Sequence, residues 1–173
     1  FKGFNHVVIK LYNDEVIIEP LKEEKEQQIA KSKAFSKTPT AIEIFAGGGT
    51  LVKALSDAGI KTVAAVELED KYLQNLETNN PNVTTYCGDL AKLDISMLPK
   101  ADMIVAGIPC EGYSQAQTKK SEKFEAHPTG SLGFYVLKII DAIRPAVVLI
   151  EEVPNFKSSA MATMTRYILD SMG

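Results

Sequence analysis

The chain has 173 residues, of which 45% are hydrophobic and 24% are charged, an ordinary composition for a globular protein. Its formal net charge of −3 argues against a self-sufficient DNA-binding domain, because such domains usually carry a basic excess that neutralises phosphates. No apolar run approaches the roughly 18 to 20 residues that a membrane span needs, and the first ten residues do not have the pattern of a signal peptide.

Residues 1–40 are expected to form an N-terminal extension. Val7–Tyr12 and Glu15–Glu19 are strand-like and flank Asn13-Asp14, which predicts a hairpin. Lys22–Lys37 is highly charged and predicts a solvated helix or a linker. None of these segments carries a recognisable chemical motif.

From Ala41 to Gly173, strand-like and helix-like segments alternate. Strands are expected at Ala41–Phe45, Thr62–Glu67, Val83–Cys87, Asp102–Ile108 and Val147–Val153. Helices are expected at Leu51–Ala58, Asp70–Asn79, Leu132–Ile143 and from Ser158 or Ser159 to Met172. Near-continuous apolar strands separated by helices predict a doubly wound α/β domain with a mostly parallel sheet, in which ligands bind at the carboxyl ends of the strands.

The two cysteines, Cys87 and Cys110, occur without a secretion signal, which indicates a reducing, intracellular setting without a structural disulfide. No CxxC pair is present, and His6 and His127 are far apart in the sequence, so no metal site is expected. Cys87 ends a strand and is interpreted as structural.

A glycine-rich turn follows the first strand of this domain. Gly47-Gly48-Gly49 leads into a helix, which allows a ligand to approach the backbone and favours an anion at the helix N-terminus. Glu67 ends the next strand, where an acid accepts hydrogen bonds from ribose hydroxyls, and Asp89 follows the third strand, where it can accept one from an adenine amino group. These positions predict a site for an adenosine-bearing ligand. A P-loop is excluded, and a NAD-type site is a weaker alternative, because Val52 stands where the dinucleotide motif has its third glycine.

Cys110 directly follows the fourth strand and Pro109, which predicts a rigidly held nucleophile at the ligand edge of the sheet. Glu151 ends the fifth strand. Because consecutive strands are usually neighbours, Cys110 and Glu151 are expected at the same edge, beside the adenosine site. A structural carboxylate that caps loop amides is the alternative for Glu151.

Six motifs between Ile42 and Phe156 resemble, in order, those of the DNA cytosine-5 methyltransferase family. The first, EIFAGGGT, looks like the family's D-L-F-A-G-x-G-G motif. The others are VELEDKYLQNLETNNP, GDL, AGIPCEGYS, GSLGFYVLKIIDAIRP and EEVPNF, the last in the place of Glu-Asn-Val. The resemblance covers about two-thirds of the chain and implies a Rossmann-like, S-adenosylmethionine-dependent methyltransferase fold.

The resemblance also implies residue roles. Cys110 would add to carbon 6 of a cytosine flipped out of double-stranded DNA, and Glu151 would hold ring nitrogen 3, so that carbon 5 accepts the methyl group. The implied cofactor-binding residues are Phe45, Ala46, Gly47, Gly48, Gly49, Glu67, Leu68, Asp89, Leu90, Pro109 and Leu132.

Four positions depart from the family pattern: Thr50 for glycine, Glu111 for glutamine, Thr129 for arginine and Glu152 for asparagine. The Glu111–Glu125 loop, with Lys119, Lys120 and Lys123, is interpreted as solvated or as closing over DNA. Glu152 adds a second carboxyl beside Glu151, which should raise the pKa of at least one of them.

The sequence contains no Gln-x-Arg-x-Arg motif and no target-recognition region. The expectation is therefore a catalytic half that acts within a longer, bacterial or phage-type cytoplasmic enzyme and contacts DNA through segments absent from this chain. A non-catalytic S-adenosylmethionine-binding remnant and a tRNA cytosine-5 methyltransferase are the alternatives. An amino-methylating adenine methyltransferase is disfavoured, because Pro109-Cys110 replaces its Pro-Pro-Tyr-type loop. The oligomeric state is not predicted.

Overall fold

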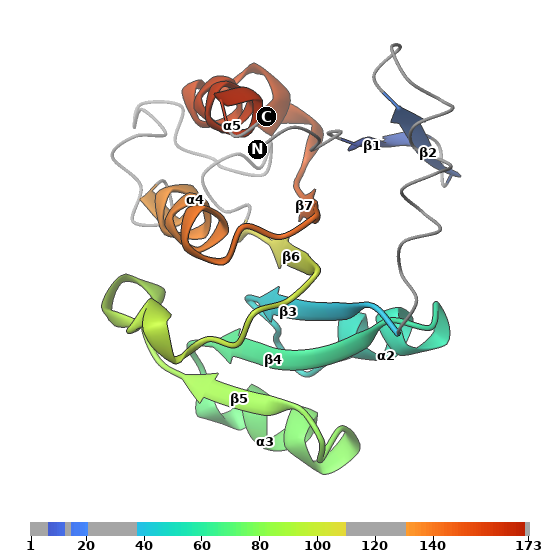
Figure 1. Ribbon diagram of the computed structural model, residues 1–173, viewed down its shortest axis with the longest axis vertical. Helices are drawn as coiled ribbons and strands as arrows, with labels where there is room; N and C mark the ends of the chain where they lie inside the picture. The colour runs from blue at the N-terminus through green and yellow to red at the C-terminus, as the bar shows by residue number, and fades with distance from the viewer. Residues whose placement is uncertain (1–6, 13–14, 21–37, 110–130, 172–173) are drawn as a thin grey trace, which may run out of the picture.

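The protein is described by a computed structural model that covers residues 7–12, 15–20, 38–109 and 131–171. Two sheets are present among these residues (Figure 1). The first is the predicted hairpin, in which β1 (Val7–Tyr12) pairs antiparallel with β2 (Glu15–Pro20) and Tyr12 faces Glu15. Residues 13–14, where the turn was predicted, and the charged segment at residues 21–37 lie outside the described residues.

The second sheet has five parallel strands in the order β5-β4-β3-β6-β7. They are β3 (Thr40–Ile44), β4 (Lys61–Glu67), β5 (Thr84–Cys87), β6 (Met103–Gly107) and β7 (Val147–Glu151). The order reverses at β3, which pairs with β4 on one side and with β6 on the other. This arrangement confirms the predicted doubly wound sheet, and the direct pairing of β6 with β7 confirms the expected neighbourhood of the last two strands.

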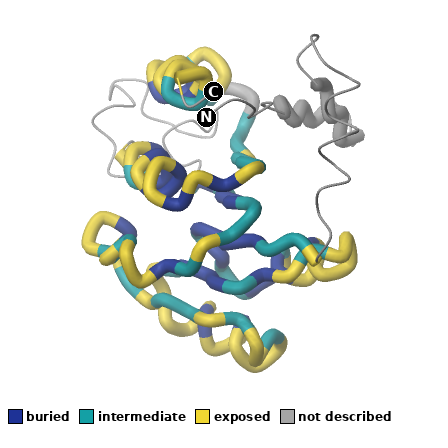
Figure 2. Tube along the Cα trace, viewed as in Figure 1, coloured by how far each residue is buried: buried dark blue, intermediate teal, exposed yellow. Residues whose placement is uncertain are grey.

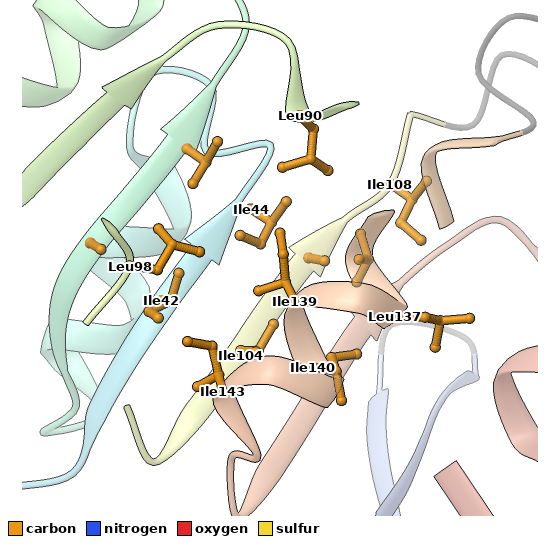
Figure 3. Packing of buried hydrophobic residues seen from close by; sticks show 14 of the residues in the cluster. Ile42, Ile44, Leu90, Leu98, Ile104, Ile108, Leu137, Ile139, Ile140 and Ile143 are labelled. Atoms are coloured by element: carbon orange, nitrogen blue, oxygen red, sulfur yellow. The ribbon is translucent and has the colours of Figure 1, made fainter. Parts of the chain in front are cut away.

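Four helices cover the two faces of this sheet (Figure 1): α2 (Thr50–Asp57), α3 (Asp70–Asn79), α4 (Leu132–Ile143) and α5 (Ala160–Ser171). Buried residues of α2 and α3 pack on the face that carries Ala65 and Val105. Residues of α4 and α5 pack on the opposite face, against Ile42, Ile44 and Ile104. Figure 3 shows the side chains of Ile139, Ile140 and Ile143 on the side of α4 that packs against the sheet.

The central strands form the buried interior, whereas the outer surfaces of the helices are exposed (Figure 2). Ser159 accepts a hydrogen bond from the backbone N–H of Ala162 at 3.0 Å, as expected for a residue that caps α5. The predicted fifth strand was too long by two residues: β7 ends at Glu151, and a 3-10 helix, η6 (Pro154–Ser158), starts after Glu152 and Val153. No helix among the described residues is long and apolar enough to cross a membrane.

Asp102 connects the amino ends of three strands through hydrogen bonds. One of its carboxylate oxygens accepts hydrogen bonds from the backbone N–H and the hydroxyl of Thr40, both at 2.8 Å. Its carbonyl oxygen accepts from Ala146 and Val147, at 2.8 and 3.0 Å. These bonds fix β3, β6 and β7 in register at the edge opposite the predicted ligand site.

Candidate active site at the carboxyl edge of the sheet

The glycine-rich turn between β3 and α2 has an unusual backbone. Phe45 has a φ of 62°, in the left-handed region that a non-glycine residue seldom adopts, and Gly49 has a φ of 87°. A Cβ atom at Gly49 would lie 3.0 Å from Cγ of Leu76 in α3. The turn therefore depends on glycine both for its backbone conformation and for its close packing on α3.

Glu67 joins this turn to the end of β4. Oε2 of its carboxylate accepts a hydrogen bond from the backbone N–H of Gly47 at 2.8 Å. Oε1 accepts from the N–H groups of Leu68 and Glu69, at 2.8 and 3.1 Å. The predicted ribose-binding acid is thus held in place by three backbone amides, and its half-buried position leaves it partly open to solvent.

Asn75 is a residue of this site that sequence reasoning missed. Its side-chain amide donates to the carbonyl oxygen of Gly48 at 3.2 Å, from the middle of α3. A Cβ atom at Gly48 would lie 2.9 Å from the same amide nitrogen. An asparagine on the exposed side of a helix gives no local signal of this role, because the contact spans 27 residues.

Leu68 follows Glu67 at the end of β4, and Asp89 lies just after the end of β5. Leu68 is 60% exposed, which is unusual for a leucine and leaves an apolar surface beside Glu67. Asp89 is exposed, and its Oδ1 accepts from the N–H of Ala91 at 2.9 Å, so that it caps the short 3-10 helix η1 (Leu90–Lys92). Its second oxygen lies 3.9 Å from Nζ of Lys92. One oxygen of Asp89 therefore has a structural partner, as a turn residue would.

The other predicted cofactor-binding residues are more enclosed. Ala46 and Leu90 are buried, and Leu90, at 7% exposed, packs in the core cluster beneath α4. Leu132 and Phe45 are partly buried against the same cluster. Leu90 and Leu132 thus lie on the face of the sheet opposite that of Glu67.

Glu151 lies level with the end of β6. It pairs in register with Gly107, and its Oε2 lies 3.7 Å from the position that a Cβ atom on Gly107 would take. Half-buried Pro109 ends this described stretch of chain. Cys110 and the Glu111–Glu125 loop lie outside the described residues. Of the two predicted catalytic residues, the structure therefore describes only Glu151, which lies at the end of β7 beside the strand that precedes Cys110.

Two further carboxyl groups near this edge have perturbed ionisation. Burial raises the pKa of Glu152 to about 7, opposed by the Val153 N–H, which donates to it at 3.0 Å, and reinforced by the charge of Glu151. Burial likewise raises the pKa of Glu43 to about 7. The raised pKa of Glu152 agrees with the prediction from its like-charged neighbour, although burial is the larger cause. Glu43 was not predicted as a site residue, but a glutamate within an apolar strand was a signal that could have identified it.

Comparison with known proteins identifies the family. Residues 40–173 match the model of the C-5 cytosine-specific DNA methylases. The chain belongs to this family.

The chain is 30% identical to the type II methyltransferase M.DsaV of Dactylococcopsis salina over 76% of its own length and 37% of that protein. It is 36% identical to M.PspPI of a Psychrobacter species over 68% of its own length and 28% of that protein. The chain thus spans well under half the length of these relatives.

The fold is also that of solved methyltransferase structures. A putative DNA modification methyltransferase encoded within a prophage of E. coli superposes with a TM-score of 0.62, at 20% identity, over 77% of this chain and 38% of the other. The Dnmt2 methyltransferase of S. pombe superposes with a TM-score of 0.60, at 18% identity, over 78% and 41%. These superpositions confirm the methyltransferase fold that the sequence predicted.

Proposed function

We propose that this chain binds S-adenosylmethionine at the Gly47–Gly49 turn and, within a longer protein, methylates carbon 5 of cytosine in DNA through Cys110. The observation that carries the proposal is the pairing of Gly107 with Glu151, because it puts an acid beside the strand that leads to Cys110, at the same sheet edge as the glycine turn. The type II methyltransferase names of the relatives support DNA as the substrate.

The described residues fit this cofactor. The glycine turn lets the ligand approach the backbone, and Glu67 retains lone pairs for ribose hydroxyls beyond those used by three amides. Exposed Leu68 offers an apolar surface to a purine ring, and Asp89 retains one oxygen for its amino group. When bound, S-adenosylmethionine supplies an electrophilic methyl group on a positively charged sulfur.

The chain's own residues would activate the cytosine. The Cys110 thiolate forms a bond to carbon 6, which removes the aromaticity of the ring and makes carbon 5 nucleophilic. Glu151 holds a proton at ring nitrogen 3, which limits the charge that develops there. After carbon 5 has gained the methyl group, a base removes its proton, the carbon–sulfur bond breaks and the thiolate is regenerated. Carbon 5 is inaccessible while the cytosine is stacked in duplex DNA, so the cytosine must first flip out of the double helix.

The test is covalent trapping on duplex DNA that contains 5-fluorocytosine, in the presence of S-adenosylmethionine. Fluorine cannot leave as a proton does, so the enzyme should remain attached to the DNA. We expect the adduct to disappear in Cys110→Ala and to persist in Cys87→Ala, which is a matched control because Cys87 is exposed and ends β5.

A parallel assay uses a form extended at the C-terminus with the corresponding segment of a relative. An adduct only in the extended form would support the proposed need for further segments for DNA. Cofactor binding without an adduct in either form would favour the non-catalytic binding module. Trapping on tRNA but not on DNA would favour the tRNA methyltransferase.

A further inference from the structure

Glu43 is an ionisable residue within β3, the central strand of the five-stranded sheet. It is 3% exposed, and its Oε2 is buried without a hydrogen-bond partner. On either side it pairs in register with Ala65 of β4 and Val105 of β6. A buried carboxyl without a full set of partners is costly to keep ionised, so its position in a folded core calls for an explanation.

The strand registers place Glu43 directly beneath the candidate site. Residues paired in register share a face of the sheet, and so do residues two apart on one strand. Glu67 lies two residues beyond Ala65, and Gly107, which pairs with Glu151, lies two residues beyond Val105. Glu43, Glu67 and Glu151 therefore share one face, with Glu43 one pleat below the other two.

Among the described residues, the elements that pack around Glu43 place no positively charged side chain beside its carboxyl group. The α2 helix contributes the backbone N–H of Val52, and the charged side chains Lys53 and Asp57 of this helix are exposed and paired with each other. β4 contributes the carboxylate of Glu67, whose charge acts on Glu43. Glu151 lies farther away, because β6 separates β7 from β3. Beside the carboxyl on β6 lie Val105 and Gly107, which are uncharged.

The ionisation of Glu43 is consequently balanced near neutral pH. Burial raises its pKa to about 7, the Val52 N–H acts against this rise, and the charge of Glu67 reinforces it. A positive charge added at this edge would favour the ionised carboxylate, whereas a neutral ligand would not.

We propose that Glu43 makes the site prefer a ligand of net positive charge, holding a proton while the site is empty and releasing it to solvent when S-adenosylmethionine binds. The inference rests on the proposed function, in which S-adenosylmethionine is the cofactor. It adds a reason why the site would distinguish the cofactor from the demethylated product, because S-adenosylhomocysteine has a neutral sulfur and no net charge. With the product bound, Glu43 takes its proton back from solvent, and the preference for the charged cofactor over the product increases with pH.

The experiment is titration calorimetry of the chain near pH 6.5, in buffers that differ in ionisation enthalpy, with S-adenosylmethionine and with S-adenosylhomocysteine. We expect a fraction of a proton to be released with the first ligand and much less with the second. Between pH 5 and pH 8, the preference for S-adenosylmethionine should rise about tenfold if its charge lowers the pKa of Glu43 by about one.

Glu43→Gln, which keeps the shape of the side chain, should still bind S-adenosylmethionine but without proton release. Glu152→Gln is the matched control, because Glu152 also has a pKa raised to about 7 but lies beyond the end of β7, with Glu151 and not Glu67 as its charged neighbour. Proton release that persists in Glu43→Gln, or equal release with both ligands, would overturn the inference.

A second measurement covers the case in which Glu43→Gln does not fold. Carboxyl carbon NMR of the Glu152→Gln chain, which lacks the other glutamate with a pKa of about 7, should show one glutamate that titrates near pH 7 and shifts to a lower pKa only with S-adenosylmethionine. The absence of such a shift would contradict the inference. If neither ligand binds at all, the proposed function fails. If both bind without proton release, only the role of Glu43 fails.

Discussion

Individual side chains at the carboxyl edge of the sheet do two things at once. Glu67 braces the glycine turn through Gly47 and is also the proposed ribose acceptor. Glu43 is the opposite case, because one of its oxygens has no partner. The two carboxyls therefore respond differently to substitution.

Glu43→Gln should change how stability depends on pH. The pKa of Glu43 rises from 4.5 to about 7 on folding, so its proton stabilises the fold fully below pH 4.5, and this contribution is lost as pH rises through 7. The full effect is at most about 3 kcal/mol. Urea unfolding from pH 5 to pH 8 should show stability declining in the unmodified chain and a smaller decline in the variant. An equal decline in both would assign the effect to other groups, such as Glu152.

Glu67→Gln should weaken cofactor binding about tenfold or more. The amide keeps one acceptor oxygen but turns an NH2 group toward a backbone N–H, so one of the three amide contacts is lost. Equilibrium dialysis with labelled S-adenosylmethionine measures the effect. Glu77→Gln, an exposed change on α3, is the control, and unchanged affinity in Glu67→Gln would contradict the assigned role.

At the scale of secondary-structure elements, contacts between distant segments fix the sheet and its helices. Asp102 binds the amino ends of β3 and β7, and Gly133 allows α4 to approach α5. Neither residue belongs to the candidate site, so we expect substitutions at these positions to lower the stability of the fold more than they weaken ligand binding.

Asp102→Ala should lower the free energy of unfolding by about 1–3 kcal/mol, because it leaves the N–H and hydroxyl of Thr40 without their shared acceptor. Asp57→Ala removes an exposed pair with Lys53 and should cost less than about 1 kcal/mol. Denaturant unfolding of both variants compares the two. Equal losses would show that the Thr40 contacts contribute little.

Gly133→Val should destabilise the packing of α4 on α5. Even a Cβ atom at this position would lie 2.7 Å from the sulfur of Met161, closer than such contacts allow. Overpacking of this kind typically costs about 1–3 kcal/mol. Ala142→Val, on the exposed side of α4, controls for the lower helix propensity of valine. Thermal unfolding should show a clear loss for Gly133→Val and a small one for Ala142→Val.

At the scale of the whole molecule, cofactor binding and folding should be coupled. The glycine turn, Glu67 and α3 form one bonded unit, so a ligand that binds this unit only in the folded chain stabilises all of it. S-adenosylmethionine at 100 times its dissociation constant should add about 2.7 kcal/mol. We expect a rise in melting temperature of roughly 5–10 °C. The rise should vanish in a Glu67→Ala variant that remains folded.

The sequence by itself determined the alternation of strands and helices, the glycine turn and the acids at strand ends. These are local patterns, set by side-chain periodicity and by the backbone freedom of glycine. It also determined the family, because six motifs occur in order along one chain. The antiparallel β1–β2 hairpin likewise followed from two short apolar runs around a turn.

The neighbourhood of β6 and β7 was predicted, but only the tertiary structure decided the full strand order, the register of the strands and which groups meet at their ends. The order β5-β4-β3-β6-β7 puts Glu151 level with Gly107 and Glu43 beneath Glu67, which no spacing in the sequence reveals. The contacts of Asn75 with Gly48 and of Asp102 with Thr40 join residues 27 and 62 positions apart. The physical reason is that burial and hydrogen bonding depend on distance in space. Burial is the largest cause of the raised pKa of both Glu43 and Glu152, and the sequence indicated only the smaller contribution of Glu151 to the pKa of Glu152.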